Sequence, residues 1–334
     1  MAEQKVDTTR LQQFARAYCE SATLYAAIDL DLFTHIANGV DTEQKLASAM
    51  GITALNVERL VTVALAMGLI EWDGKTLCNA PDTARFLVKG RPTYAADWLM
   101  FTRPSVPEWF RLAEHLRRKE PPITLGVFEN LTVEDARKYH SATYSIGVGA
   151  AKRFSRLVDL SKRRKLLDVG GGSGAYSIVA VKTFPNLRAV VLDLPPVTEV
   201  TKEYLKLNGV EDRVTTLPGD FTKTPFPNDV DAVVMASNLP IYDEEMIQLV
   251  VSKVHAALLP GGEFHLVGEM TNDDRSGPLD AALWGMTEAI WHSGGKTHTI
   301  SQCIGYFKQA GFAKISDEVF VPGTLHRVTG IKTG

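Results

Sequence analysis

Apolar residues at three- and four-residue spacing dominate the first part of the chain, which is typical of amphipathic helices. The segments with this spacing are 11–37, 41–50 and 56–69. Asp41 is expected to cap the second helix. The stretch 69–81 follows with two short apolar runs around Asp73-Gly74, which is a strong hairpin signal. Three helices and a hairpin predict a winged helix within residues 1–90.

Residues 91–155 keep a helical pattern but are unusually rich in aromatic side chains, among them Trp98, Tyr139 and Tyr144. Packing in a core is the ordinary role of such rings. Arg103, in "MFTRPSV", is a candidate to hold a substrate carboxylate, although a surface position is the more common one for an arginine. We expect this segment to be a helical linker that contributes to a substrate pocket.

From Lys165 the pattern changes to alternating strands and helices. The strand-like runs are 165–171, 188–195, 213–220, 230–238 and 262–270. This alternation predicts an α/β domain over residues 156–334, with a parallel sheet covered by helices on both faces. A last helix at 299–311 and two strands, 313–321 and 325–333, are expected to close the domain with an antiparallel pair.

The composition of the chain excludes several classes of partner and site, although it does not identify the function. A formal net charge of −3 over 334 residues argues against nucleic acid as an obligate partner, because phosphate binding needs a basic face. Three scattered cysteines predict a reducing compartment, with neither a disulfide framework nor a Cys-rich metal site. The polar start shows no signal peptide, and the apolar run 61–70 is about half a membrane span. We therefore expect a cytoplasmic protein with no membrane partner.

The composition of the third helix of the predicted winged helix also argues against DNA binding. The stretch "ALNVERLVTVALAMG" has one Arg and no Lys. A helix this apolar is better suited to burial against a second subunit. We expect a homodimer formed through the N-terminal domain.

A glycine-rich turn, "LLDVGGGSGAYS", joins the first strand of the α/β domain to its helix. Glycine lets the backbone approach a ligand closely, and Gly170, Gly172 and Gly174 provide this. Asp193 ends the next strand, where a carboxylate can bind ribose hydroxyls. Taken alone, this pattern also fits a dinucleotide-binding protein. The third strand ends in "LPGDF", whose Asp-Phe pair suits an adenine amine and ring.

The series "DVGGGSG…LDLP…GDF…LPGGE" resembles the class I S-adenosylmethionine-dependent methyltransferases. With its winged-helix front, the chain resembles the O-methyltransferase family that includes the caffeate, hydroxyindole and polyketide methyltransferases. The resemblance implies a Rossmann-like catalytic domain, S-adenosylmethionine as cofactor and a small-molecule substrate. The residues it places at the cofactor are Gly170, Gly172, Gly174, Asp193, Leu194, Asp220, Phe221 and Ser237.

One position departs from the family. Where the family has Leu-His-Asp-Trp, with the histidine as general base, this chain has Leu239-Pro240-Ile241-Tyr242. Proline cannot accept a proton. A thioether acceptor has no proton to lose, so we expect S-methylation of a methylthio-hydroxy acid such as 4-methylthio-2-hydroxybutyrate. The chain is in this respect similar to the bacterial methylthiohydroxybutyrate S-methyltransferases of dimethylsulfoniopropionate synthesis. The candidate substrate-binding residues are Trp98, Arg103, Tyr139, Asn238, Trp284 and Trp291.

Other interpretations stay open. An O- or C-methyltransferase would use His292 or His140 as its base, and a metal for C-methylation would be held by Glu288, His292 and His298. A non-catalytic regulator that senses S-adenosylmethionine is the alternative from another class. The favoured site holds no metal, and its candidate catalytic residues are Tyr144, His140, Glu288 and His292.

Overall fold

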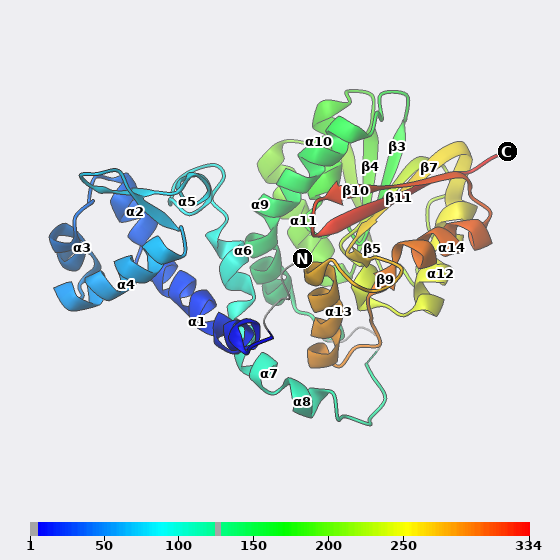
Figure 1. Ribbon diagram of the computed structural model, residues 1–334. Helices are drawn as coiled ribbons and strands as arrows, with labels where there is room; N and C mark the ends of the chain where they lie inside the picture. The colour runs from blue at the N-terminus through cyan, green and yellow to red at the C-terminus, as the bar shows by residue number, and fades with distance from the viewer. Residues whose placement is uncertain (1–5, 124–127) are drawn as a thin grey trace, which may run out of the picture. The chain divides into compact units, whose positions relative to one another are not determined.

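The computed structural model describes residues 6–123 and 128–334. The chain divides into two compact units, residues 1–103 and 104–334 (Figure 1). The boundary falls inside the segment 91–155, and four residues of that segment, 124–127, lie outside the described residues. The three-part division into 1–90, 91–155 and 156–334 therefore stays a prediction.

The N-terminal unit is a set of helices with one hairpin. Its helices are α1 (Thr9–Asp29), α2 (Leu32–Ala37), α3 (Glu43–Met50), α4 (Ala54–Ala66), α5 (Pro81–Phe86) and α6 (Ala96–Phe101). The hairpin pairs β1 (Ile70–Trp72) antiparallel with β2 (Leu77–Asn79), as the Asp73-Gly74 signal predicts. Side chains such as Leu32, Phe33 and Leu46 bury a core of their own between these elements.

Two details of this unit correct the sequence prediction. The segment expected to be one helix is two, because the chain turns at Asp31, whose φ is +56°. The N-cap of α3 is Thr42, whose hydroxyl accepts from the backbone of Lys45, while Asp41 pairs with the Lys45 side chain at 2.8 Å. Among the described residues no single helix is long and apolar enough to cross a membrane. Helices α3 and α4 reach that length only together, with a bend of 110° between them.

The C-terminal unit is built on a seven-stranded sheet in the order β10-β11-β7-β6-β3-β4-β5. Its strands are β3 (Lys165–Val169), β4 (Arg188–Asp193), β5 (Val214–Pro218), β6 (Val230–Ala236), β7 (Leu258–Gly268), β10 (Ala313–Val321) and β11 (Leu325–Ile331). The first five run parallel, and β11 pairs antiparallel with both β7 and β10. This confirms the α/β prediction and its closing antiparallel pair.

Helices cover both faces of this sheet (Figure 1). One face carries α9 (Val133–Leu157), α10 (Ala175–Thr183) and α11 (Pro195–Asn208), and the other carries α12 (Glu244–Ala257) and α14 (Ile300–Ala310). The remaining elements are η1 (Arg103–Ser105), α7 (Val106–Phe110), α8 (Leu112–His115), η3 (Leu239–Ile241), β8 (Met270–Thr271), α13 (Leu279–Trp291) and β9 (His298–Thr299). Strand residues such as Leu167 and Val233 are fully buried, since helices enclose the sheet from both sides.

Candidate active site

The strand order reverses between β3 and β6, and ligands of open α/β sheets bind beyond the carboxyl ends of the strands at such a point. Gly170 follows β3 directly, with φ at +64° and its N–H donating to the Leu192 carbonyl at 2.8 Å. A Cβ on residue 170 would lie 2.6 Å from Nδ2 of Asn238. The turn therefore needs glycine for its conformation and for its lack of a side chain.

Asp193, at the end of β4, is tied to this glycine turn. Its two carboxylate oxygens accept from the N–H groups of Gly172, at 2.8 Å, and Leu194, at 2.7 Å. Burial raises the pKa of Asp193 to about 6, and the two N–H groups oppose that shift. Each oxygen keeps a second lone pair for a ribose hydroxyl. This cradle fits the nucleoside and methionine parts of S-adenosylmethionine.

Asp220 and Phe221 follow β5 at the same edge of the sheet. Burial acts to raise the pKa of Asp220, but hydrogen bonds from Thr222 and the ion pair with Lys223 outweigh it, and the net shift is downward. Asp220 is thus held as a carboxylate that can accept from an adenine amine. The Phe221 ring is buried and meets the Tyr242 ring edge-on at 5.3 Å.

Ser237 and Asn238 directly follow β6, on the other side of the point where the strand order reverses. Ser237 has φ at +56° and donates its N–H to the Val267 carbonyl at 2.9 Å. The side-chain amide of Asn238 donates to the carbonyls of Ala236, at 2.9 Å, and Gly170, at 3.1 Å. Asn238 thereby links the end of β6 to the turn after β3, and its amide nitrogen is occupied by backbone.

Pro240 lies buried in η3, next to a loop that follows α13. A Cβ on Gly295 would run into the carbonyl oxygen of Pro240, so the two backbones are in close contact. Ser293 lies on the same loop and is therefore held near Pro240. Residue 240 therefore offers no proton acceptor from its side chain, but α13 and its loop supply other groups at this place.

Glu288 is the ionisable group that α13 contributes here, with only 2% of its surface exposed. The Ser293 hydroxyl donates to its carboxylate, and the N–H of Gly295 donates to the same hydroxyl at 3.0 Å. Burial raises the pKa of Glu288 to about 7, against the opposing hydrogen bond from Ser293. A carboxyl poised near neutrality can take up or release a proton under ordinary conditions.

His292 and His298, which follow Glu288 in the sequence, make contacts of other kinds. His292 ends α13 with φ at +57°, and its carbonyl accepts from the N–H of Ile123 at 2.8 Å. Backbone N–H groups and, to a smaller extent, His292 lower the pKa of the exposed Glu120. His298 is buried with both ring nitrogens engaged, by the Tyr306 hydroxyl at 2.8 Å and the Tyr242 carbonyl at 2.9 Å.

These engagements leave His298 unable to coordinate a metal without breaking its bonds. Within residues 6–123 and 128–334, no three His, Cys, Asp or Glu side chains are grouped to hold a metal ion. A metal held by Glu288, His292 and His298 is not supported by this arrangement.

Tyr139 and His140 of α9 both reach the cofactor edge of the sheet. A Cβ on Gly172 would lie 2.6 Å from Cε1 of His140, so this ring packs on the glycine turn. Burial lowers the pKa of His140 to about 4, and the ring is neutral and weakly basic at neutral pH. Burial raises the pKa of Tyr139 to about 12, and the carboxylates of Glu269, Asp193 and Glu288 add to the shift.

Aromatic rings connect Tyr139 to α13. Phe128 meets Tyr139 edge-on at 6.0 Å and Trp291 edge-on at 6.1 Å. The structure thus brings two of the candidate substrate-binding residues into one cluster. Trp284, on the same helix as Trp291, is half-buried.

Tyr144 lies one turn further along α9 and faces α11. Its hydroxyl accepts from Nδ2 of Asn208 at 2.7 Å, and its ring stacks on Tyr204 with centroids 4.3 Å apart. These contacts are those of a packing residue, and its catalytic role stays a prediction that they do not support.

Trp98 and Arg103 belong to the N-terminal unit. The Trp98 ring stacks on Phe101 at 5.6 Å. The Arg103 guanidinium pairs with Asp29 at 2.6 Å, both side chains being about half exposed. Substrate binding by either residue stays a prediction.

Sequence reasoning missed Glu269, which directly follows β7. It is 7% exposed, and its Oε2 is buried without a hydrogen-bond partner among the described residues. Burial raises its pKa to about 7. The sequence held a signal for it, because Glu269 follows the strand-like run "FHLVG" much as Asp193 follows the apolar run of β4.

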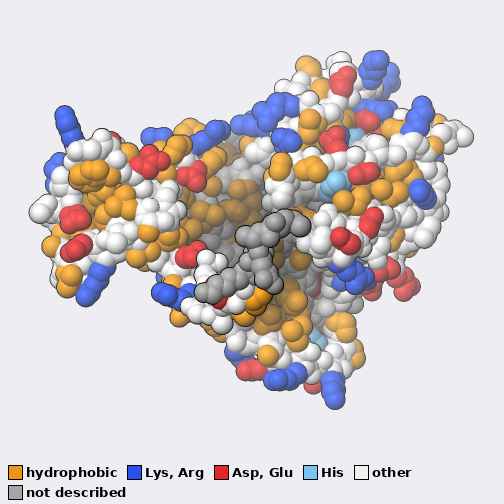
Figure 2. Space-filling view, viewed as in Figure 1, with side chains coloured by type: hydrophobic (Ala, Val, Ile, Leu, Met, Phe, Trp, Pro, Cys, Tyr) orange, Lys and Arg blue, Asp and Glu red, His pale blue; other side chains and the backbone are white. Residues whose placement is uncertain are grey.

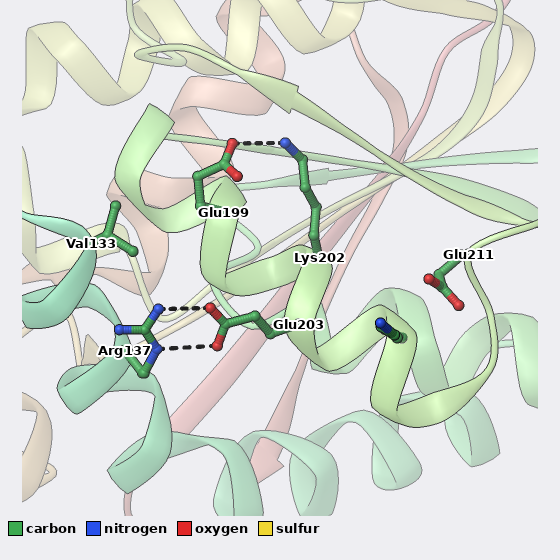
Figure 3. Close-up of a pocket in the computed structure, with 7 residues that line it drawn as sticks. Val133, Arg137, Glu199, Lys202, Glu203 and Glu211 are labelled. Carbon is green, nitrogen blue, oxygen red and sulfur yellow. Dashed lines mark hydrogen bonds and ion pairs between the residues drawn. The ribbon is translucent and has the colours of Figure 1, made fainter.

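A wide hollow of about 500 Å³ lies elsewhere, between α9 and α11 (Figure 3). Two ion pairs lie in its lining, Arg137 with Glu203 at 2.7 Å and Lys202 with Glu199 at 2.7 Å. A smaller hollow of about 160 Å³ adjoins η3 and is lined by Pro122, Ile241, Tyr242, Asp243, Met246 and Gly294. None of the residues that line the larger hollow, which also include Val133, Lys206 and Glu211, is among the candidate site residues considered above.

Residues 128–313 match the family described as the O-methyltransferase domain, which covers more than half of the chain. The chain belongs to this family. It is 30% identical over 97% of its length to 3-hydroxy-5-methyl-1-naphthoate 3-O-methyltransferase of Streptomyces sahachiroi, 95% of which is covered. It is 25% identical to acetylserotonin O-methyltransferase of Bos taurus, with 91% of this chain and 92% of the relative covered.

Solved structures show the same fold as this methyltransferase. Human N-acetylserotonin methyltransferase in complex with S-adenosylmethionine matches over 100% of both chains, with a TM-score of 0.81 and 20% identity. An O-methyltransferase family protein from Burkholderia thailandensis matches over 99% of both, with a TM-score of 0.82 and 20% identity. The chain is thus an S-adenosylmethionine-dependent small-molecule methyltransferase, and the regulator hypothesis loses its basis.

Proposed function

We propose that this methyltransferase methylates a hydroxyl oxygen of an aromatic small molecule, with Glu288 as the general base. The observation that carries the proposal is the buried Glu288 carboxyl, bonded by Ser293 on the loop that packs against Pro240. The proposal moves the base from the position of the family's histidine to a neighbouring helix.

The acid–base properties of Glu288 suit this role. A phenol with a pKa near ~10 is mostly protonated at neutral pH and gains ~10²–10⁴-fold in rate from a positioned base. A carboxyl whose pKa is raised to about 7 is a stronger base than an ordinary glutamate and is still about half ionised at neutral pH. S-adenosylmethionine supplies the electrophilic methyl group. Glu288 takes the hydroxyl proton as the oxygen attacks, and the Ser293 hydroxyl holds the carboxylate in place.

The histidines are weaker candidates for the base. His140 is neutral but only weakly basic, because burial lowers its pKa to about 4. His292 stands at the end of α13, where its backbone is in the left-handed region and its carbonyl accepts from the N–H of Ile123. Either histidine as the base of an O- or C-methyltransferase therefore has less support than Glu288.

The aromatic cluster of Phe128, Tyr139 and Trp291 supports a flat acceptor, since ring faces and edges pack well against another ring. The naphthoate relative is named for methylation of a hydroxyl on a fused aromatic acid. A hydroxynaphthoate is accordingly the first acceptor to test.

Thioether S-methylation is the second candidate, and Pro240 is the observation that favours it. The deciding experiment incubates the protein with S-adenosylmethionine and an equimolar mixture of 3-hydroxy-1-naphthoate and 4-methylthio-2-hydroxybutyrate. Mass spectrometry should find the O-methylated naphthoate. A sulfonium product with unmodified naphthoate would overturn O-methylation in favour of the thioether reaction of dimethylsulfoniopropionate synthesis.

We also propose that the protein is a homodimer through its N-terminal unit. Leu11, Phe14 and Tyr18 share one face of α1, and each is more than half exposed. Figure 2 shows further hydrophobic side chains on the surface of this unit, beside charged ones. A second copy would cover such a face. Sedimentation should find a dimer, and Phe14→Glu should weaken it, whereas a wild-type monomer at micromolar concentration would refute the proposal.

A further inference from the structure

Glu269 lies close to Ser237, a candidate cofactor residue, and to Glu288, beside which we propose that the acceptor binds. It follows β7, and β7 pairs in parallel with β6, whose end carries Ser237. Burial raises the pKa of Glu269, and its own backbone N–H and the Ser237 side chain act against that shift. Its Oε2 is buried and has no hydrogen-bond partner in the described chain. An unpaired buried carboxylate oxygen is costly, so its retention calls for a ligand.

The groups that surround this carboxyl are acids and phenols. Asp280 and Glu288 of α13 raise its pKa, after burial as the main cause. Its own charge raises the pKa of Tyr139 on α9 and Tyr176 on α10, in both cases after burial. None of these neighbours can neutralise a negative charge, and together they favour a cation.

Tyr139 connects Glu269 with the glycine turn and Asp193, which form the candidate cofactor site. The pKa of Tyr139, raised first by burial, responds to both Glu269 and Asp193. Tyr139 also adjoins His140, which packs on Gly172. Glu269 thus lies near Tyr139 and, through the pairing of β6 with β7, at the same edge of the sheet as Ser237.

We propose that Glu269 recognises the positive sulfonium centre of S-adenosylmethionine through the carboxylate oxygen that has no protein partner. The sulfonium, rather than the ammonium, is chosen because the methyl donor must face the acceptor and Glu269 adjoins Glu288. That choice rests on the proposed acceptor position beside Glu288. The product S-adenosylhomocysteine has lost the sulfonium charge, so Glu269 discriminates donor from product and assists product release.

The test measures binding without any acceptor, so it does not depend on Glu288 acting as a base. Calorimetry at about pH 6, in two buffers of different ionisation enthalpy, counts the protons released. The ammonium groups of both ligands stay protonated there, whereas most of the Glu269 carboxyl is protonated before binding. Wild-type protein should release nearly one proton more with S-adenosylmethionine than with S-adenosylhomocysteine, because any proton that Asp193 exchanges is exchanged with both ligands. Equal proton counts would overturn the proposal.

The affinities of the variant Glu269→Gln for the two ligands, measured at about pH 7.5, give a second test. Its affinity for S-adenosylmethionine should fall by ~10–100-fold, since a charge-assisted contact is lost, and its affinity for S-adenosylhomocysteine by less than about threefold. Asp280→Asn is the matched control, because it removes a neighbouring charge and should keep the discrimination. An equal loss for both ligands in Glu269→Gln would contradict sulfonium recognition. Proton counting on wild-type protein decides the matter if the variant does not fold.

Discussion

Gly295 lies so close to the carbonyl of Pro240 that residue 295 has no room for a Cβ. This contact seats the loop after α13, with Ser293 on it, against the position where the family carries its histidine. Glu288 and its serine partner are therefore fixed relative to residue 240 by backbone packing rather than by a side-chain bond.

Gly295→Ala should displace this loop. Overpacking of this kind costs about 1–3 kcal/mol, and turnover should fall because Ser293 moves away from Glu288. Gly294→Ala is the control, since its nearest neighbour, Cγ of Pro122, would be 3.8 Å from the new Cβ. Urea denaturation and steady-state rates check both variants. Equal behaviour of the two would show that the Pro240 contact does not matter.

Asp193→Ala should abolish measurable cofactor binding. The substitution removes the proposed ribose acceptor and the partner of the Gly172 and Leu194 N–H groups. Hydrogen bonds to a charged group contribute about 1.5–3 kcal/mol each, so the affinity should fall by more than ~100-fold. Calorimetry with S-adenosylmethionine measures this, with the exposed Asp212→Ala as control. Retained affinity would refute the cofactor site.

Tyr144→Phe tests a catalytic assignment that the contacts do not support. The change removes the hydrogen bond from Asn208 and keeps the stack on Tyr204. The free energy of unfolding should fall by about 1 kcal/mol, with turnover unchanged. A tenfold loss of kcat at unchanged stability would restore Tyr144 as a catalytic residue.

Stability should depend on pH through Glu269. Burial raises its folded-state pKa from 4.5 to about 7, so the folded protein binds a proton more tightly than the unfolded chain. This contribution is fully present below about pH 4.5 and is lost as the pH rises through about 7, a change of up to about 3 kcal/mol. The unfolding free energy of Glu269→Gln should show a shallower fall over this range. An identical slope in both proteins would place the titration elsewhere.

The sequence was sufficient to predict the sheet and to place the candidate cofactor residues at one edge of it, because both depend on local patterns. Buried strands read as apolar runs, and Asp193 and Asp220 stand directly after such runs. Side-chain partners were harder to predict. Tyr144 pairs with Asn208 across 64 residues and Arg103 with Asp29 across 74, and the packing that brings them together leaves no mark in either local sequence.

The two acids Glu288 and Glu269 also show the difference between what local sequence patterns predict and what depends on the packing of distant residues. Glu288 could be found from helical spacing, but its bond to Ser293 depends on the left-handed turn at His292, which periodicity does not reveal. Glu269 was visible as an acid after a strand. Its importance lies in an unpaired oxygen, which only the surrounding packing defines.

The most direct test of the account is the pH dependence of single-turnover methylation of 3-hydroxy-1-naphthoate by wild-type protein and Glu288→Gln. Since burial raises the pKa of Glu288 to about 7, the wild-type rate should rise with pH below about 7 and then level off. Glu288→Gln should be at least ~100-fold slower at neutral pH and lack this rise, while Glu269→Gln keeps it. A Glu288→Gln profile that matches the wild type in rate and shape would contradict Glu288 as the base.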